Sequence, residues 1–193
     1  MRSTCAVLFA LVQIVGGAAA QSVNQQQCPG ADPDLSISGC TAMIQSGQQT
    51  QQQLALDYAA RGVAYLRKGQ RDRAIQDFNQ VIRLNPNYGL AYNARGAAYL
   101  AKGQRDRAIE DFDQAIRLNP NGAFLSFNNR GAAYLAKGQT DRAIADFDQA
   151  IRLSPNYAQA FYDRALAKRA KGDAAGADAD MARARQLSPS NPP

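Results

Sequence analysis

A sequence motif of about 34 residues occurs four times along this chain of 193 residues. The motif is clearest over 95–120. Closely similar copies begin at Arg61 and at Arg130, and a more divergent copy begins at Arg164. The prolines that close the copies are spaced 34, 35 and 34 residues apart: Pro86, Pro120, Pro155 and Pro189. A fixed period of this length is typical of stacked supersecondary units, so the chain is expected to form an elongated array of repeats.

Each copy has the residue spacing of two helices. In the copy 89–122, Tyr92, Gly96 and Tyr99 lie four and three residues apart, which places them on one helix face. The second half again has apolar residues at helical spacing, at Ala108, Phe112, Ala115 and Ile116. A Gly-Gln pair separates the halves, and the closing Asn-Pro disfavours further helix. Each copy therefore predicts a helix–turn–helix unit, with large residues facing small ones, that buries its apolar face only against neighbouring units.

This order of residues resembles the tetratricopeptide repeat (TPR). In the third copy the matching positions are Gly131, Tyr134, Ala143, Phe147, Ala150 and Pro155. The resemblance spans the array 54–191, with copies at 55–88, 89–122, 124–157 and 158–191. The fourth copy departs from the pattern, because Ala165, Lys168 and Met181 replace Gly, Tyr and Phe. The resemblance implies an all-α solenoid of about four repeats, whose first helices line a concave groove.

Residues 1–20 are interpreted as an export signal. Arg2 precedes an apolar run from Cys5 to Val15, and Ala18–Ala20 supply a small-residue cleavage site, so the mature chain is expected to begin at Gln21. The run is shorter than the ~20 residues that span a bilayer, and an uncleaved anchor is the alternative. We expect a periplasmic or secreted protein without stable membrane insertion. A signal followed by such repeats resembles exported bacterial TPR proteins.

The mature chain would retain two cysteines, Cys28 and Cys40. An isolated pair in an oxidising compartment predicts a disulfide, and a gap of 11 residues is unlike the redox-active Cys-x-x-Cys motif. Residues 36–44 align with the second helix of the first repeat, with Cys40 at the position of Phe78. We therefore expect a half-repeat cap helix at 34–46 within a region 21–53, tied by the disulfide to the Gln-rich tail Gln21–Gln27.

Three smaller expectations concern the connections and the C-terminal end. Gln48–Gln53 could be a loop or could open the first repeat helix. One extra residue near Gly122 predicts a slightly longer loop between the second and third copies. The last helix, at about 174–187, is rich in alanine and is expected to act as its own cap.

The composition argues against an enzyme. The chain has no histidine, which removes imidazole catalysis and the commonest metal ligand. With both cysteines in a disulfide, no zinc site is expected, and no phosphate-binding glycine loop is present. We therefore predict no catalytic residue, cofactor or metal. Two sets of charged residues recur in every repeat and are interpreted as structural: Asp77, Asp111, Asp146 and Asp180, and Arg61, Arg95, Arg130 and Arg164. Each arginine is expected to lie between helices and to bond a nearby carboxylate or a helix C-terminus.

The predicted function is a scaffold or adaptor that binds a protein or peptide. The resemblance implies groove positions on the first helices, and the candidate binding residues are Leu90, Asn93, Ala97, Leu125, Asn128, Ala132 and Tyr162; Leu56, Val63 and Leu166 occupy further groove positions. The two asparagines could bond a peptide backbone, or they could simply be solvated. TPR modules that grip a C-terminal carboxylate use basic residues where this chain has Ala59, Val63 and Ala94, so that subclass is not expected.

The charge suggests an alternative function. The net charge is +6, and loss of Arg2 with the signal would leave +5. Most of the excess lies near the turns, at Arg67, Lys68, Lys102, Arg105, Lys137, Lys168, Arg169 and Lys171. This basic edge could bind an anionic envelope polymer or lipid headgroups, an interaction that salt would weaken. Nucleic acid is not expected in an exported compartment, and self-association through the open repeat ends is a third option.

Overall fold

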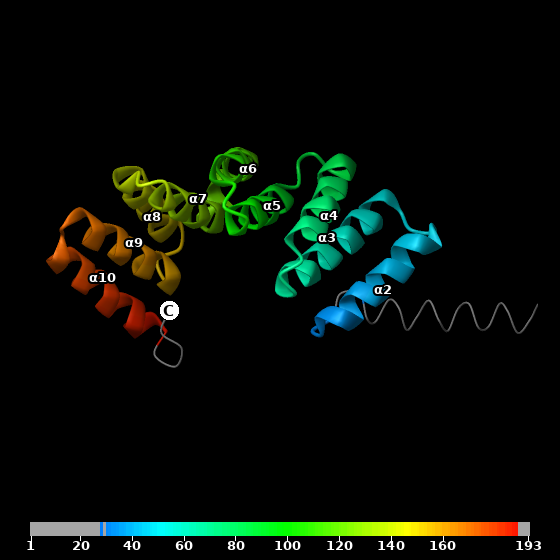
Figure 1. The fold of residues 1–193 in the computed structure, drawn as a ribbon, viewed down its shortest axis with the longest axis horizontal. Coiled ribbons are helices and arrows are strands. Elements are labelled where there is room, and N and C mark those ends of the chain that lie inside the picture. The colour runs from blue at the N-terminus through cyan, green and yellow to red at the C-terminus, as the bar shows by residue number, and fades with distance from the viewer. Residues whose placement is uncertain (1–27, 29, 189–193) are drawn as a thin grey trace, which may run out of the picture. The chain divides into compact units, whose positions relative to one another are not determined.

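A computed structural model of the chain describes residue 28 and residues 30–188. This part contains nine α-helices, one 3₁₀ turn and no strand, and the helices pack in consecutive pairs (Figure 1). It divides into two compact units, one ending at Pro86 and the other beginning at Asn87. Among the described residues no helix is long and apolar enough to cross a membrane. The predicted all-α array of helical pairs is confirmed.

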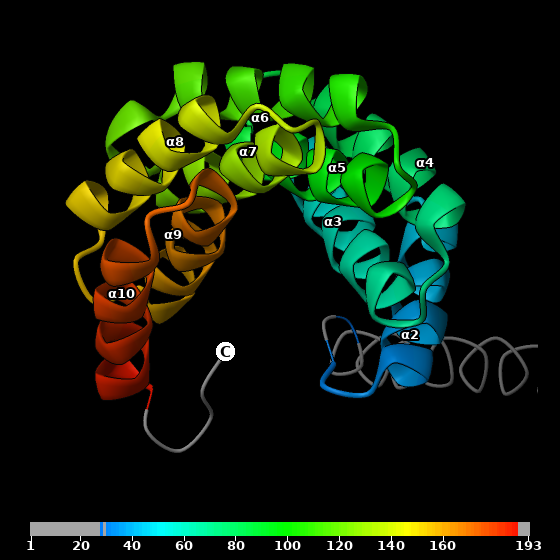
Figure 2. The ribbon, with the colours of Figure 1, turned by 60° about the vertical axis from the view of Figure 1, so that its left-hand side comes forward.

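The first unit contains α2 (Pro33–Ser46), α3 (Gln51–Arg67) and α4 (Arg71–Leu84), which lie side by side in chain order (Figures 1 and 2). Helix α2 starts with a proline at its first position and with Asp32 as its N-cap, whose carboxylate accepts from two backbone amides. Helix α3 is capped by Thr50, so Gln51–Gln53 open the first repeat helix and Gln48–Gln49 precede it. Helix α2 lies where the half-repeat was expected and packs on α3.

The second unit contains three helical hairpins. These are α5 (Gly89–Ala101) with α6 (Arg105–Leu118), α7 (Phe124–Ala136) with α8 (Thr140–Leu153), and α9 (Ala158–Lys171) with α10 (Ala174–Leu187). The extra residue between the second and third copies is accommodated in the 3₁₀ turn η1 (Pro120–Gly122), where the Asn119 side chain accepts from the Gly122 amide at 3.1 Å. Helices α9 and α10 lie alongside each other in both views (Figures 1 and 2).

Each hairpin turn contains a glycine with a left-handed backbone. The φ angles are between 68° and 92° at Gly69, Gly103, Gly138 and Gly172. Side chains disfavour this conformation, whereas glycine adopts it freely, so each glycine ends the first helix and reverses the chain. The short turn makes the two helices of each repeat antiparallel neighbours.

The core of each of the first three hairpins is a phenylalanine ring packed on a helix backbone. A Cβ placed on Gly96 would lie 2.7 Å from Cε1 of Phe112, and one on Gly131 would lie 2.7 Å from Cε1 of Phe147. Phe112 and Phe147 are fully buried. This contact explains a glycine in the middle of a helix, which by propensity alone costs about 1 kcal/mol relative to alanine.

A disulfide joins Cys28 to Cys40 at the N-terminal end of the first unit. Cys40 is fully buried and forms an apolar cluster with Cys28 and Met43, against which Ala60 of α3 packs. Cys40, whose position aligns with Phe78, is thus buried in the cap as Phe78 is buried in the first repeat. The signal at 1–20, its cleavage site and the tail Gln21–Gln27 lie outside the described residues.

Candidate functional site

Four arginines of the first helices form ion pairs inside the helical hairpins. In each repeat the guanidinium binds the aspartate sixteen residues later through two nitrogens, at 2.6–2.9 Å, in the pairs Arg61–Asp77, Arg95–Asp111, Arg130–Asp146 and Arg164–Asp180. Each arginine also lies 5.3–5.6 Å from the centroid of the aromatic ring three residues earlier. The expectation that these recurring arginines bond a nearby carboxylate is confirmed. We call the four carboxylates the arginine-held aspartates.

The arginines lower the cost of burying these charges. Burial acts to raise the pKa of Asp180, but hydrogen bonds from Arg164 and Lys168 outweigh it, and the pKa lies below its ordinary value. Burial acts to lower the pKa of Arg130, yet its bonds to Asp146 and Asp113 raise that pKa. Both shifts favour the charged forms, as expected of ion pairs that belong to the fold.

The lysines near the turns are also paired. Lys68 binds Asp34, Lys137 binds Asp106, and Lys171 binds Asp141 at 2.6 Å. In all three pairs a lysine at the end of a first helix reaches the start of the preceding second-type helix. Lys168 and Arg169 bind aspartates of α10. Much of the positive charge expected to form a basic edge is therefore neutralised locally.

The seven candidate binding residues all lie in the second unit, on α5, α7 and α9; we call them the first-helix face. Leu90 and Leu125 are exposed, and the two asparagines, two alanines and Tyr162 are half-buried or buried. Six large apolar side chains are exposed in the described part of the chain. The exception is Leu35. The other five occupy groove positions of the first helices: Leu56, Val63, Leu90, Leu125 and Leu166.

Polar side chains link the three first helices of the second unit. Asn93 Oδ1 on α5 accepts from Ser126 Oγ and Asn129 Nδ2 on α7, both at 3.1 Å. Asn128 Nδ2 on α7 donates to Asp163 Oδ2 on α9 at 2.8 Å. Both predicted asparagines therefore bond the next repeat. Sequence reasoning missed Asn129 and Asp163, although both occupy the same position of the repeat and could have been found by aligning the copies.

Asn128 and Asp163 together have more acceptors than donors. Asn128 is only 4% exposed, and its Oδ1 has no donor among the described residues. Asp163 accepts from Asn128 and from Gln159 Nε2 at 2.8 Å, both neutral amides. Burial raises the pKa of Asp163, and these two hydrogen bonds offset it only in part.

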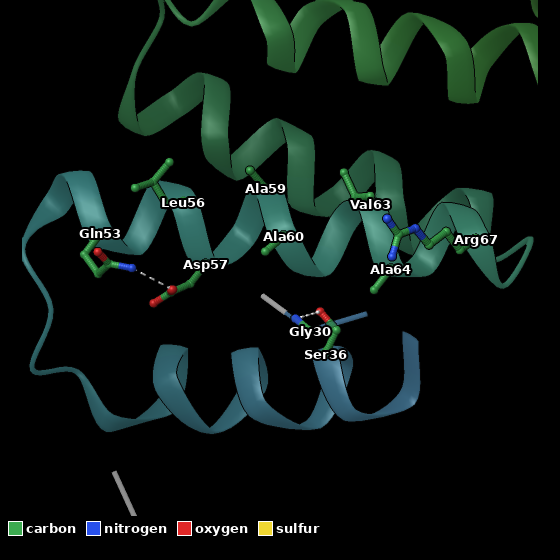
Figure 3. A pocket seen from close by; sticks show the side chains of 10 residues that line it. All are labelled: Gly30, Ser36, Gln53, Leu56, Asp57, Ala59, Ala60, Val63, Ala64 and Arg67. Atoms are coloured by element: carbon green, nitrogen blue, oxygen red, sulfur yellow. Dashed lines mark hydrogen bonds between the residues drawn. The ribbon is translucent and has the colours of Figure 1, made fainter. Parts of the chain in front are cut away.

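A cavity of about 410 Å³ lies along α3 in the first unit (Figure 3). Its walls are largely aliphatic, and Figure 3 shows Gln53 and Asp57 toward one end of the labelled side chains and Arg67 toward the other. Asp57 is 2% exposed and accepts from Gln49 Nε2 at 2.9 Å and Gln53 Nε2 at 3.0 Å. Asp57 and Asp163 thus share one arrangement, a carboxylate held by two amides, and we call them the amide-held aspartates.

A smaller cavity of about 250 Å³ lies in the second unit, between the start of α5, the end of α6, η1 and the start of α7. Leu90 and Ser126 both line it, so it adjoins the first-helix face. Within residues 28 and 30–188, histidine, cysteine and acidic side chains form no cluster suited to a metal ion.

Repeated helical hairpins, each closed by the same Arg–Asp pair, define an α-helical repeat protein. A family model described as "TPR repeat" matches residues 62–103 and 131–172, and one described as "Tetratricopeptide repeat" matches 89–121. The chain belongs to the tetratricopeptide repeat family. No curated protein matches the sequence.

Solved structures share the fold. A crystal structure of MamA superposes with a TM-score of 0.72 at 20% identity, covering 86% of this chain and 95% of MamA. MamA 41-end from Desulfovibrio magneticus RS-1 gives 0.74 at 18% identity, covering 90% and 96%. The first TPR of Spaghetti (RPAP3), bound to the HSP90 peptide SRMEEVD, gives 0.59 at 25% identity, covering 62% of this chain and 94% of that domain.

Proposed function

We propose that the protein is a non-enzymatic scaffold that binds a segment of another protein on its first helices. The observation that carries this proposal is the placement of the exposed apolar side chains, five of six of which lie at groove positions of the first helices. Exposed apolar side chains that gather mainly on one kind of surface are typical of a protein interaction site.

The polar residues of the first-helix face supply the second element of such a site. An extended peptide presents backbone N–H groups, and Asn128 Oδ1 is an acceptor without a donor among the described residues. Leucine side chains beside polar groups suit a segment that inserts apolar residues while its backbone is bonded. That the RPAP3 domain was solved with a peptide supports this mode of binding.

A carboxylate-terminated ligand is not proposed. TPR modules that bind such ligands share polar and basic residues at certain positions of these helices. This chain has Ala59, Val63 and Ala94 at those positions. The anionic-polymer alternative also receives little support, because five of the turn cations are engaged with aspartates.

We further propose that the protein works in an exported compartment, after cleavage following Ala20. Two features support this: the sequence of residues 1–20 and the disulfide between Cys28 and Cys40, a bond that persists in oxidising compartments.

The test is affinity capture from envelope extract with bait isolated from the exported fraction, where intact mass should place its first residue at Gln21. Leu90→Ser/Leu125→Ser should lower recovery of the main partner about tenfold, since apolar anchors dominate such interfaces. Leu35→Ser removes a leucine outside the groove positions whose exposure lies between those of Leu90 and Leu125, and it should leave recovery unchanged. Equal recovery with all three baits would refute binding at this face, and bait retained in the cytosol with residues 1–20 attached would refute export.

A further inference from the structure

The cavity of the first unit combines aliphatic walls with one buried carboxylate. Ala59, Ala60, Val63 and Ala64 of α3 supply most of the wall, and the backbone at Gly30 with Ser36 lies opposite (Figure 3). At about 410 Å³ the cavity has room for a long side chain and the backbone that carries it.

Asp57 lacks a cationic partner among the described residues. Its two donors are the side-chain amides of Gln49 and Gln53. The Cys28 sulfur lies 3.7 Å from Oδ1, but as a disulfide sulfur it has no hydrogen to donate. Each arginine-held aspartate, by contrast, binds a guanidinium of its own repeat. The charge on Asp57 therefore lacks a compensating cation, although the residue is almost fully buried.

A second atom nearby also lacks a donor. Gln49 Oε1 is buried and has no hydrogen-bond partner among the described residues. Exchanging the nitrogen and oxygen of the Gln49 amide by a half-turn would point its oxygen at the Asp57 carboxylate and its N–H groups away from it. The carboxylate therefore fixes the orientation of the Gln49 amide. The site therefore has a surplus of acceptors and a deficit of donors.

We propose that this cavity binds an alkylammonium group, and that its occupant is a lysine side chain of the protein partner. The methylenes would contact the aliphatic wall and the ammonium would meet Asp57, while Arg67 disfavours a cation toward the other end of the cavity (Figure 3). The chain itself cannot supply this group from a side chain beyond the described residues, because Arg2, within the predicted signal, is the only cationic residue there. The assignment to a partner rests on the proposed function.

The direct test uses the disulfide-bonded protein, with hexylammonium as the probe and 1-hexanol as its uncharged analogue. In ¹H–¹⁵N spectra, hexylammonium should shift the amides of Ala60 and Ala64 saturably, with at least tenfold higher affinity than 1-hexanol. Asp57→Asn should lower that affinity at least tenfold, whereas Asp178→Asn, an exposed aspartate of α10, should not change it. Equal affinity for both probes, or for wild type and Asp57→Asn, would overturn the proposal.

A second variant covers the case in which Asp57→Asn fails to fold. Val63→Phe enlarges an exposed side chain at the cavity and leaves the carboxylate intact, so it should also weaken hexylammonium binding at least tenfold. Unchanged binding would contradict the proposal.

Partner capture separates this inference from the proposed function. If wild type and Asp57→Asn recover the partner equally, or if replacing the partner's lysines has no effect, the lysine assignment fails and the scaffold stands. If no partner is recovered but hexylammonium binds as expected, the scaffold fails and the ammonium site stands.

Discussion

The arginine-held and the amide-held aspartates occupy different places in the same repeat. The arginine-held set recurs at one position on the second helices and faces the interior of its own hairpin, where a guanidinium binds both oxygens. The amide-held pair, Asp57 and Asp163, lies on the first helices and has only neutral donors. The comparison indicates that the fold neutralises the charges it uses for its own stability. The two amide-held aspartates lie on α3 and α9, first helices that also carry the exposed Leu56 and Leu166.

The largest expected effect comes from breaking an arginine-held pair. Arg130→Met leaves Asp146 buried without its cation and also removes the bond to Asp113, so the free energy of unfolding should fall by about 2–3 kcal/mol. The measurement is the urea midpoint followed by circular dichroism. The double variant Arg130→Met/Asp146→Leu removes both charges and should recover most of the loss. An unchanged midpoint in the single variant would place these pairs among surface ion pairs of little energetic value.

A smaller effect concerns pH: the contributions of the arginine-held and the amide-held aspartates to the free energy of unfolding should change with pH in opposite directions. The pKa of Asp180 is lowered below 3.8, so its contribution to stability is present above that value and is lost as pH falls through the folded pKa. The pKa of Asp163 is raised above 3.8, so its contribution is present at low pH and is lost as pH rises through the folded pKa.

The corresponding experiment compares wild type with Asp180→Asn and Asp163→Asn in urea between about pH 3 and pH 7. Relative to its variant, Asp180 should become more stabilising as pH rises, and Asp163 should become less stabilising. Tyr157 is the titratable neighbour of Asp163, and its own pKa is raised by burial and by that carboxylate, so it stays neutral in this range. Slopes of the same sign would abolish the distinction between the two sets.

The smallest effect is expected from the lysines near the turns. Lys137 pairs with Asp106, whose side chain is 79% exposed, and such pairs contribute little in water. Lys137→Ala should therefore change the free energy of unfolding by about 0.5 kcal/mol or less, and added salt should remove the difference. A loss comparable with that of Arg130→Met would show that exposure does not decide which charges matter.

The repeat made much of the fold predictable, because a feature that recurs can be recognised in any copy. The helix limits follow from the recurring turn glycines and closing prolines, and the Gly–Phe contact and the Arg–Asp pairs join residues at a constant spacing of sixteen. Asp57 has no counterpart in the other copies, which have Ala91, Ser126 and Ala160 at its position, and Gln49 precedes the first copy. Their hydrogen bond depends on how the connection before α3 folds against that helix, which a single sequence does not reveal.

The glycine–phenylalanine contact has a consequence for how such an array can change its length. The first three repeats share it, whereas the fourth has Ala165 and Met181 at the same two positions. Exchanging first or second helices among the first three repeats would preserve the contact. Joining α9 to α8 would press a methyl group against the Phe147 ring, and joining α7 to α10 would leave a gap beside Met181. The α9–α10 hairpin therefore keeps its own contact only when its two helices are exchanged together.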